Sequence, residues 1–395
     1  MFLNHSEEFL RNLGVLHTRT EIAQQPRIWN EVYKIIEDQK EAISAFFESV
    51  TSAHPRIKVI LTGAGTSAFI GDTVQLYLNK VCDKSIFMIQ SIPTTNIVSN
   101  PNEYLAAETP TIMVSFARSG NSPESVAAVE LGEQLVKDFY QIQITCNKDG
   151  QLAKKTENRK DTLLLLMPEE TNDQSFAMTS SFTSMMLSVL LVFQLDQLDN
   201  LEATVSSISN RGADILVSAS QRLEEIANLP ITNIVYLGSG SFLGLAHEAS
   251  LKMLELTNGD VFTYYESPLG LRHGPKTIIN DQTLAFVYVS SDSYTQKYDI
   301  DLLKELYKEK ERTTLKVMAI SDQYLQVVEE NSDFYFHQNK VEVTNDIWLA
   351  LPFIIYAQML AVFKSLKLEL HPDNPVPNGS VNRVVQGVTI YPFNN

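Results

Sequence analysis

The sequence predicts an α/β protein made of two tandem, doubly wound parallel-sheet domains with a helical extension before the first domain. Two observations favour this class. Short strand patterns alternate with helical patterns along the chain, which is typical of βαβ units and a parallel sheet. The strand patterns are continuously apolar, as in VILT (59–62) and LLLLM (163–167), which indicates a sheet covered by helices on both faces.

A third observation is that the two halves of the chain repeat one another, which sets the number of domains. Each half has an apolar strand running into a turn of glycine and hydroxyl residues, then two further strands, then an Asn-Asp pair before a long apolar helix. The matching segments are KVILTGAGTS (58–67) and NIVYLGSGS (233–241), TIMVSFARSG (111–120) and LAFVYVSSDS (284–293), QIQITCN (141–147) and KVMAISD (316–322), ETND (170–173) and VTND (343–346).

The repeat divides the chain into three parts. Residues 1–48 are expected to form the helical extension, with Thr20 as a helix cap and Pro26 as a break. The first domain is expected at 49–205 and the second at 212–395, separated by the polar stretch 206–211. The last residues are rich in Pro, Asn and Gly, which predicts a tail that wraps over the surface before a last short strand.

Composition narrows the function. The 395 residues are 44% hydrophobic and 20% charged, which is typical of a globular protein. A net charge of −16 argues against a nucleic-acid or membrane-surface partner. Cys82 and Cys146 lack metal-ligand or redox spacing, and the N-terminal stretch lacks the features of a signal peptide, so we expect a cytoplasmic protein. The apolar segment 347–363 is expected to be a buried helix rather than a membrane span.

Two turns of the first half predict an anion site. Glycines allow close backbone approach, hydroxyls donate hydrogen bonds, and the following helix favours a negative charge. Turns are commonly made of such residues, but two of them at equivalent strand ends, without nucleotide-site spacing, favour a small phosphorylated ligand. The corresponding second-half turns are poorer, because one carries Asp292. The first-half candidates are Gly63, Gly65, Thr66, Ser67, Arg118, Ser119, Gly120, Asn121 and Ser122.

The second half supplies candidate acid–base residues. Glu248, Lys252 and Glu255 lie on one stripe of an otherwise apolar helix. A solvent-exposed Glu–Lys pair would explain the first two equally well, whereas a carboxylate walled by apolar groups is suited to act as a general base. In LGLRHGP (269–275), His273 lies on a loop too rich in glycine and proline to be regular structure.

The stretches GAGTS, FARSGNSPES, HEASLKMLEL and LRHGP, in this order, resemble the SIS (sugar isomerase) family. Among its members the chain is similar to the isomerase half of glucosamine-6-phosphate synthase, and most of all to AgaS-type galactosamine-6-phosphate deaminase/isomerases. The resemblance implies that Ser67, Ser119 and Ser122 hold a sugar phosphate beside Gly65, Thr66 and Arg118. It implies that Glu255 moves a proton between C1 and C2, with Lys252 on the same helix, and that His273 opens the sugar ring. Thr179 and Ser180 match a loop near the ligand.

The departures from the family pattern refine the expected function. Without a glutamine-hydrolysing domain a synthase is not expected. Gln386 stands where the synthase has a Schiff-base lysine, Arg272 replaces a lysine, and Arg118 replaces a neutral glutamine. The resemblance implies hydrolytic deamination of a 2-amino-2-deoxyhexose 6-phosphate, most of all galactosamine 6-phosphate to tagatose 6-phosphate and ammonia. It also implies a homodimer or higher homo-oligomer, and neither cofactor nor metal. An aldose–ketose isomerase, a fructosamine-phosphate deglycase and a non-catalytic sugar-phosphate sensor remain as alternatives.

Overall fold

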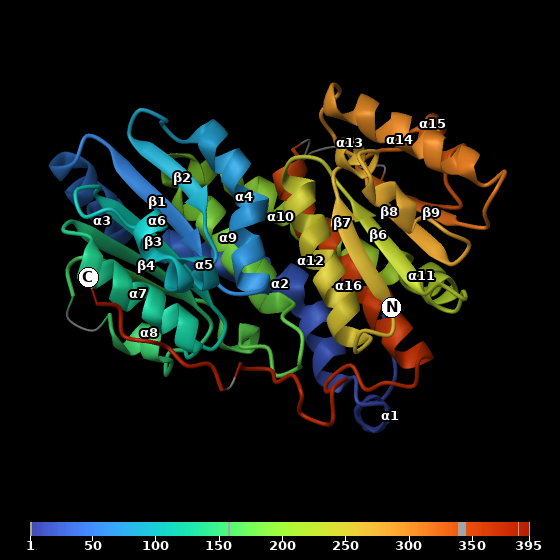
Figure 1. Cartoon of the computed structure of the whole chain (residues 1–395), viewed down its shortest axis with the longest axis horizontal. Coiled ribbons are helices and arrows are strands. Elements are labelled where there is room, and N and C mark those ends of the chain that lie inside the picture. Colours follow the sequence, from blue (N-terminus) through green and yellow to red (C-terminus); the bar gives the residue numbers. More distant parts are fainter. Residues whose placement is uncertain (1, 157–158, 339–344, 386, 395) are drawn as a thin grey trace. The chain divides into compact units, whose positions relative to one another are not determined.

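The computed structural model describes residues 2–156, 159–338, 345–385 and 387–394 (Figure 1). The chain forms two compact units, which we name by their strands. The β1–β5 unit comprises Arg27–Asp173, Met178–Glu202 and Asn378–Asn395, and the β6–β10 unit comprises Met1–Pro26, Gln174–Ala177 and Ala203–Pro377. The C-terminal tail therefore belongs to the β1–β5 unit.

The β1–β5 unit contains a five-stranded, fully parallel sheet in the order β2-β1-β3-β4-β5. Because β2 and β3 lie on opposite sides of β1, the direction of winding reverses between β1 and β3. The strands are β1 (Ile57–Thr62), β2 (Phe87–Ser91), β3 (Thr111–Ala117), β4 (Phe139–Thr145) and β5 (Thr162–Leu166). Its helices include α3 (Lys40–Ala53), α4 (Thr66–Val81), α5 (Thr94–Ser99), α6 (Pro101–Tyr104), α7 (Pro123–Leu135), α8 (Gln151–Lys154) and α9 (Ser180–Val192).

The β6–β10 unit repeats this topology in the order β10-β9-β8-β6-β7, again fully parallel. The predicted fold class is confirmed. The strands are β6 (Asn233–Leu237), β7 (Phe262–Glu266), β8 (Thr283–Tyr288), β9 (Lys316–Ser321) and β10 (Phe334–His337). The helices include α1 (Glu7–Asn12), α11 (Ser220–Ala227), α12 (Ser241–Leu256), α13 (Pro268–Leu271), α14 (Thr295–Glu309), α15 (Gln326–Glu329) and α16 (Asp346–Lys367), with a 3-10 turn at Pro275–Ile278.

The apolar segment 347–363 forms most of α16, which packs against α11 and α12 in the core of the β6–β10 unit. It is long and apolar enough to cross a membrane, yet 94% of its most apolar window is buried within the protein. It therefore serves as a core helix of a folded unit, as the sequence predicts.

The N-terminal extension is helical, but its predicted interruption is wrong. The helix α2 (Leu16–Asp38) runs through both Thr20 and Pro26. The Thr20 hydroxyl donates to the Leu16 carbonyl inside the helix instead of capping it. Pro26 lacks the N–H that would bond the Ile22 carbonyl, and Gln25 Nε2 donates to that carbonyl at 3.0 Å instead. This substitute bond offsets the usual helix-breaking effect of an interior proline.

Two further expectations concern the ends of the domains. Residues 206–211, expected between the domains, lie inside the helix α10 (Leu198–Ser218). The expected last strand is wrong, because residues 387–394 form no strand. The Phe393 carbonyl accepts a hydrogen bond from Gln134 Nε2 at 3.0 Å, and its ring packs against the hydrophobic cluster beneath α7. At residue 393 the tail is thus held by a packed side chain and a bonded carbonyl rather than by a strand ladder.

Candidate active site

The two predicted phosphate-binding turns follow β1 and β3, which are adjacent in the sheet at the point where its winding reverses. Ligands of open parallel sheets bind at this place. The first turn leads into α4 through Gly65, whose φ of 55° favours glycine. A Cβ at Gly65 would meet nothing within 4 Å. The N-terminus of α4 therefore faces open space that can receive an anion.

Thr66 and Ser67 begin α4 and are nearly buried, at 4% and 5% exposure. The Ser67 hydroxyl contacts Met178 Sδ at 3.8 Å. A thioether sulfur is a weak acceptor, so this hydroxyl can exchange it for a phosphate oxygen at little cost.

The second turn places Ser119 and Ser122 at the carboxyl end of β3. Gly120 has a φ of 65°, and the Ser119 carbonyl is held by Asn147 Nδ2 at 2.8 Å. Ser122 is the N-cap of α7 but makes no side-chain capping bond. The turn is thus fixed through its backbone, which leaves the Ser122 hydroxyl uncommitted to the helix.

Arg118, directly before these serines, is 7% exposed, and its guanidinium donates to the Arg383 carbonyl of the C-terminal tail at 2.6 Å. This guanidinium is therefore engaged by the protein's own C-terminal tail. The Arg383 guanidinium in turn donates to the Asp173 carbonyl.

Asp173 organises the start of α9. Its carboxylate accepts hydrogen bonds from the backbone N–H groups of Thr179 and Ser181, both at 2.9 Å, and from the Ser180 hydroxyl. Thr179 and Ser180 are fully buried. The structure thus places these two predicted substrate contacts in an internal helix cap, and the Ser180 hydroxyl is engaged by Asp173. Their contact with a ligand stays a prediction.

The corresponding turns of the β6–β10 unit are filled by carboxylates of the chain. Asp346 accepts hydrogen bonds from the Ser290 hydroxyl at 2.5 Å and from the Ser291 N–H and hydroxyl, both at 2.7 Å. Asp299 accepts from the Ser239 hydroxyl at 2.8 Å and the Ser290 N–H at 2.9 Å. These donors therefore bond carboxylates of the chain itself, and the expectation that the second-half turns are the poorer anion site stays a prediction.

Burial raises the pKa of Asp299 to about 6, against the opposing effect of the Ser290 N–H and the Ser239 hydroxyl. Because the folded pKa lies above the unfolded one, the folded chain binds the extra proton between about pH 4 and pH 6. The contribution of Asp299 to stability therefore falls as the pH rises through this range, by about 3 kcal/mol in total.

We expect Asp299→Asn, which cannot titrate, to gain this amount relative to the wild type between pH 4 and pH 7. Urea unfolding at several pH values measures the difference. Asp214→Asn, at an exposed position of α10, is the control and should run parallel to the wild type. If the unfolding free energies of Asp299→Asn and the wild type also changed in parallel with pH, Asp299 would titrate normally.

The helix α12 brings the charged side chains of Glu248, Lys252 and Glu255 together. Lys252 Nζ lies 2.5 Å from Glu255 Oε2 and 3.4 Å from Glu248 Oε1. The side chains of Lys252 and Glu248 are fully buried, whereas that of Glu255 is 25% exposed. The alternative of a solvent-exposed Glu–Lys pair is therefore wrong, because the flanking apolar residues bury this face. Glu255 is the member of the group that a ligand can reach.

The loop after β7 presents His273. Its backbone N–H donates to the Gly270 carbonyl, and its side chain is exposed between α13 and Gly274, whose φ is 122°. Arg272 stands where the family has a lysine. Its Nε donates a hydrogen bond to Glu305 Oε2 at 2.6 Å. Lys276 Nζ lies 2.5 Å from Glu305 Oε1. Burial raises the pKa of Glu305, but Lys276 and Arg272 outweigh this effect and lower it.

Within each unit, the structure therefore brings together some of the predicted site residues. Ser67, Ser119 and Ser122 share one edge of the β1–β5 sheet, and Lys252 and Glu255 share one helix of the β6–β10 unit. Gln386, predicted at the position of the synthase lysine, lies outside the described residues.

Comparison with known proteins decides the family. Residues 53–195 match the family model of the SIS domain. The chain is 42% identical to the D-galactosamine-6-phosphate deaminase AgaS of Shewanella sp. (strain ANA-3) over 391 residues, which cover 98% of this chain and 95% of the relative. The chain belongs to the AgaS group of the SIS family.

Solved structures of related SIS proteins agree with this assignment. A crystal structure from Clostridium novyi NT is 43% identical, with a TM-score of 0.95 over 100% of this chain and 99% of that one. The tagatose-6-phosphate ketose/aldose isomerase of Escherichia coli is 39% identical, with a TM-score of 0.87 over 96% of this chain and 97% of that one.

The sequence analysis did not single out three residues whose hydrogen bonds hold the turns and the tail of this SIS chain: Asp173, Asp346 and Arg383. The first two end the repeated Asn-Asp pairs, so the repeat itself carried a signal for them. The equivalent aspartates act differently, since Asp173 caps its own helix while Asp346 binds the serine turn. No pattern in the sequence pointed to Arg383, because its hydrogen-bond partners are more than 200 residues away along the chain.

Proposed function

We propose that this chain hydrolyses galactosamine 6-phosphate to tagatose 6-phosphate and ammonia, in the cytoplasm. The observation that carries the proposal is its 42% identity, over nearly the full length of both chains, to a relative named as a D-galactosamine-6-phosphate deaminase. The arrangement of charged and hydroxyl groups in each unit fits this chemistry.

The sugar phosphate is bound by the turns after β1 and β3. The hydroxyls of Ser67, Ser119 and Ser122 and the backbone around Gly65 and Thr66 supply the donors, and the open space at Gly65 leaves room for the anion. Hydroxyl and backbone donors at the start of a helix suffice for a phosphate without a cluster of lysines.

Glu255 is the general base. In the open-chain sugar its carboxylate takes the proton from C2 while O1 gains a proton, which gives an enolamine, and it then delivers the proton to C1 while the amine nitrogen loses one. The product is an imine at C2, which water hydrolyses to the ketose and ammonia. Lys252, 2.5 Å from Glu255 Oε2, fixes the orientation of this carboxylate. Proton transfer between adjacent carbons requires a positioned carboxylate within reach of the substrate.

His273 opens the pyranose ring by moving a proton between O5 and O1. Its exposed position on a loop held by Arg272 and Lys276 fits a group that is presented to a ligand. We propose that the chain forms a homodimer in which this histidine serves the site of the neighbouring subunit.

A plain aldose–ketose isomerase is the second candidate. The name of the Escherichia coli relative, tagatose-6-phosphate ketose/aldose isomerase, favours it, and the same carboxylate would catalyse it. Only the deaminase releases ammonia.

Ammonia release from a panel of sugar phosphates separates these activities. We expect release from galactosamine 6-phosphate to exceed that from glucosamine 6-phosphate, with tagatose 6-phosphate as the other product. Conversion of an aldose 6-phosphate to its ketose without ammonia release would support the isomerase. Binding of these compounds without any turnover would indicate a sensor.

A further inference from the structure

The buried guanidinium of Arg118 makes a contact that phosphate binding does not explain. Arg118 follows β3 directly, at the sheet edge that carries the phosphate turns, and only 7% of the residue is exposed. A buried cation requires hydrogen-bond partners within the protein. One of its nitrogens donates to the Arg383 carbonyl at 2.6 Å, which ties the phosphate turn to the C-terminal tail.

Arg383 completes a clasp of two arginines. Its own guanidinium donates to the Asp173 carbonyl and lies 3.4 Å from Asn172 Oδ1. Each arginine thus donates to a backbone carbonyl of the next segment, from Arg118 to the tail and from the tail to residue 173. Because the Asp173 side chain caps α9, the clasp joins three segments of the β1–β5 unit that are far apart in sequence.

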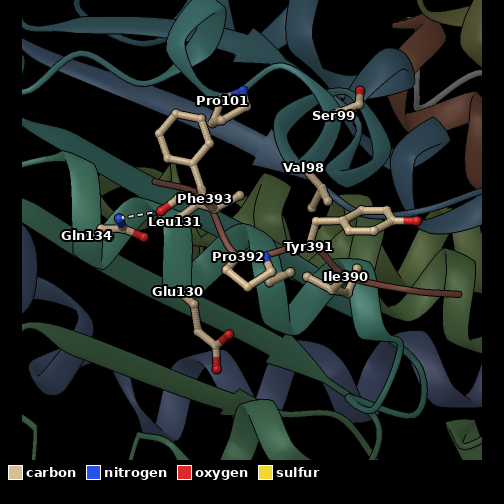
Figure 2. Close-up of a pocket in the computed structure, with 11 residues that line it drawn as sticks. Val98, Ser99, Pro101, Glu130, Leu131, Gln134, Ile390, Tyr391, Pro392 and Phe393 are labelled. Carbon is tan, nitrogen blue, oxygen red and sulfur yellow. Dashed lines mark hydrogen bonds between the residues drawn. The ribbon is translucent and has the colours of Figure 1, made fainter. Parts of the chain in front are cut away.

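A second anchor holds the far end of the tail. Figure 2 shows residues Ile390 to Phe393 lining a cavity together with Val98, Pro101 and Leu131, and Gln134 bonded to the Phe393 carbonyl. The tail is therefore fastened at residue 383 by the clasp and at residue 393 by packing. Residues 390–393 lie beside α7, with whose residues they line the cavity (Figure 1).

We propose that Arg118 is a positioning residue that fixes the C-terminal tail beside the phosphate turns, and that it is not a ligand of the phosphate. The proposal rests on the proposed function for the identity of the site. The serine hydroxyls and backbone N–H groups bind the phosphate, and the arginine clasp sets the position of the tail along the same sheet edge, where ligands of parallel sheets bind.

The test compares Arg118→Gln with Arg383→Ala, which breaks the clasp without touching the phosphate turn. Arg159→Gln is the matched control, since Arg159 belongs to the same unit and pairs with Asp161 and Glu133 at the surface. Ser119→Ala reports the loss of a phosphate ligand. For each full-length variant, calorimetry measures the Kd of inorganic phosphate, and ammonia release measures kcat and KM.

We expect both clasp variants to keep the phosphate Kd of the wild type within about twofold, while kcat falls by about 10- to 100-fold through misplacement of the tail. Trypsin should also cut after Arg383 faster in Arg118→Gln than in the wild type. Ser119→Ala should weaken phosphate binding, and Arg159→Gln should change none of these quantities.

A tenfold or larger rise in the phosphate Kd of Arg118→Gln would overturn the proposal, because it would make Arg118 a phosphate ligand. Unchanged kcat in both clasp variants would overturn it as well. Should Arg118→Gln fail to fold, Arg383→Ala decides by the same two measurements. Failure of the proposed function is distinguishable, since the phosphate Kd and the trypsin cleavage rate do not depend on which sugar is the substrate.

Discussion

Replacing Glu255 with glutamine is expected to lower kcat for galactosamine 6-phosphate by about 10²- to 10⁴-fold, the usual contribution of a general base. Glutamine has nearly the same shape, and its amide oxygen can still accept the hydrogen bond from Lys252 Nζ that Glu255 Oε2 accepts at 2.5 Å. What it lacks is the ability to take a proton from C2. We therefore expect the variant to fold and to bind inorganic phosphate as tightly as the wild type.

Steady-state ammonia release and exchange of the C2 proton with solvent measure the two consequences. Both should be lost together, because the same carboxylate removes the proton and returns it. Glu225→Gln, at an exposed position of α11 in the same unit, is the matched control and should behave as the wild type. Retention of C2 proton exchange in Glu255→Gln would assign the base to another residue.

Replacing Lys252 with methionine is expected to cost about 3–5 kcal/mol of unfolding free energy, the typical penalty for removing one partner of a buried ion pair. Lys252 is fully buried between Glu255 and Glu248, and the Glu248 side chain is fully buried too. Without the ammonium group, the fully buried Glu248 loses the positive charge that lies 3.4 Å from its Oε1. The variant should also lose activity, because Glu255 is no longer held in place.

Urea unfolding at neutral pH measures the loss. The double variant Glu248→Leu/Lys252→Met removes both buried charges while keeping similar volume, and we expect it to regain most of the lost stability. It should not regain activity, since Glu255 still lacks its partner. A double variant as unstable as Lys252→Met would show that packing of the lysine stem, rather than loss of the Lys252–Glu248 charge pair, accounts for the loss.

Much of the fold follows from local patterns. The inner strands β1, β3, β6 and β8 are mostly apolar and almost wholly buried, so they are visible in the sequence as strands buried on both faces. The edge strands β2, β7 and β10 are only partly buried and were not predicted, whereas the edge strand β5 was predicted from its run of leucines. An edge strand pairs on one side only, and its mixed polar and aromatic composition carries a weak signal.

The candidate site likewise has features that local spacing predicts and features that it does not. The serine turns and the stripe of Glu248, Lys252 and Glu255 depend on spacing within a turn or a helix, and short-range pattern is sufficient to find them. The spacing does not decide whether that stripe faces solvent, because it fits both an exposed Glu–Lys pair and a carboxylate surrounded by apolar side chains. Burial against α16 and β7 decided it.

The sequence by itself determined that the chain has two similar parallel sheets, and which turns can present donors to an anion, because strand and helix periodicities and turn residues act over a few positions. Only the tertiary structure decided how each donor is used. Ser290 and Ser291 are occupied by Asp346, 55 or more residues away, and Arg118 is joined to Arg383 across 265 residues. Such partners are chosen by the folded path of the backbone, which brings distant segments to one sheet edge, and no local pattern records that choice.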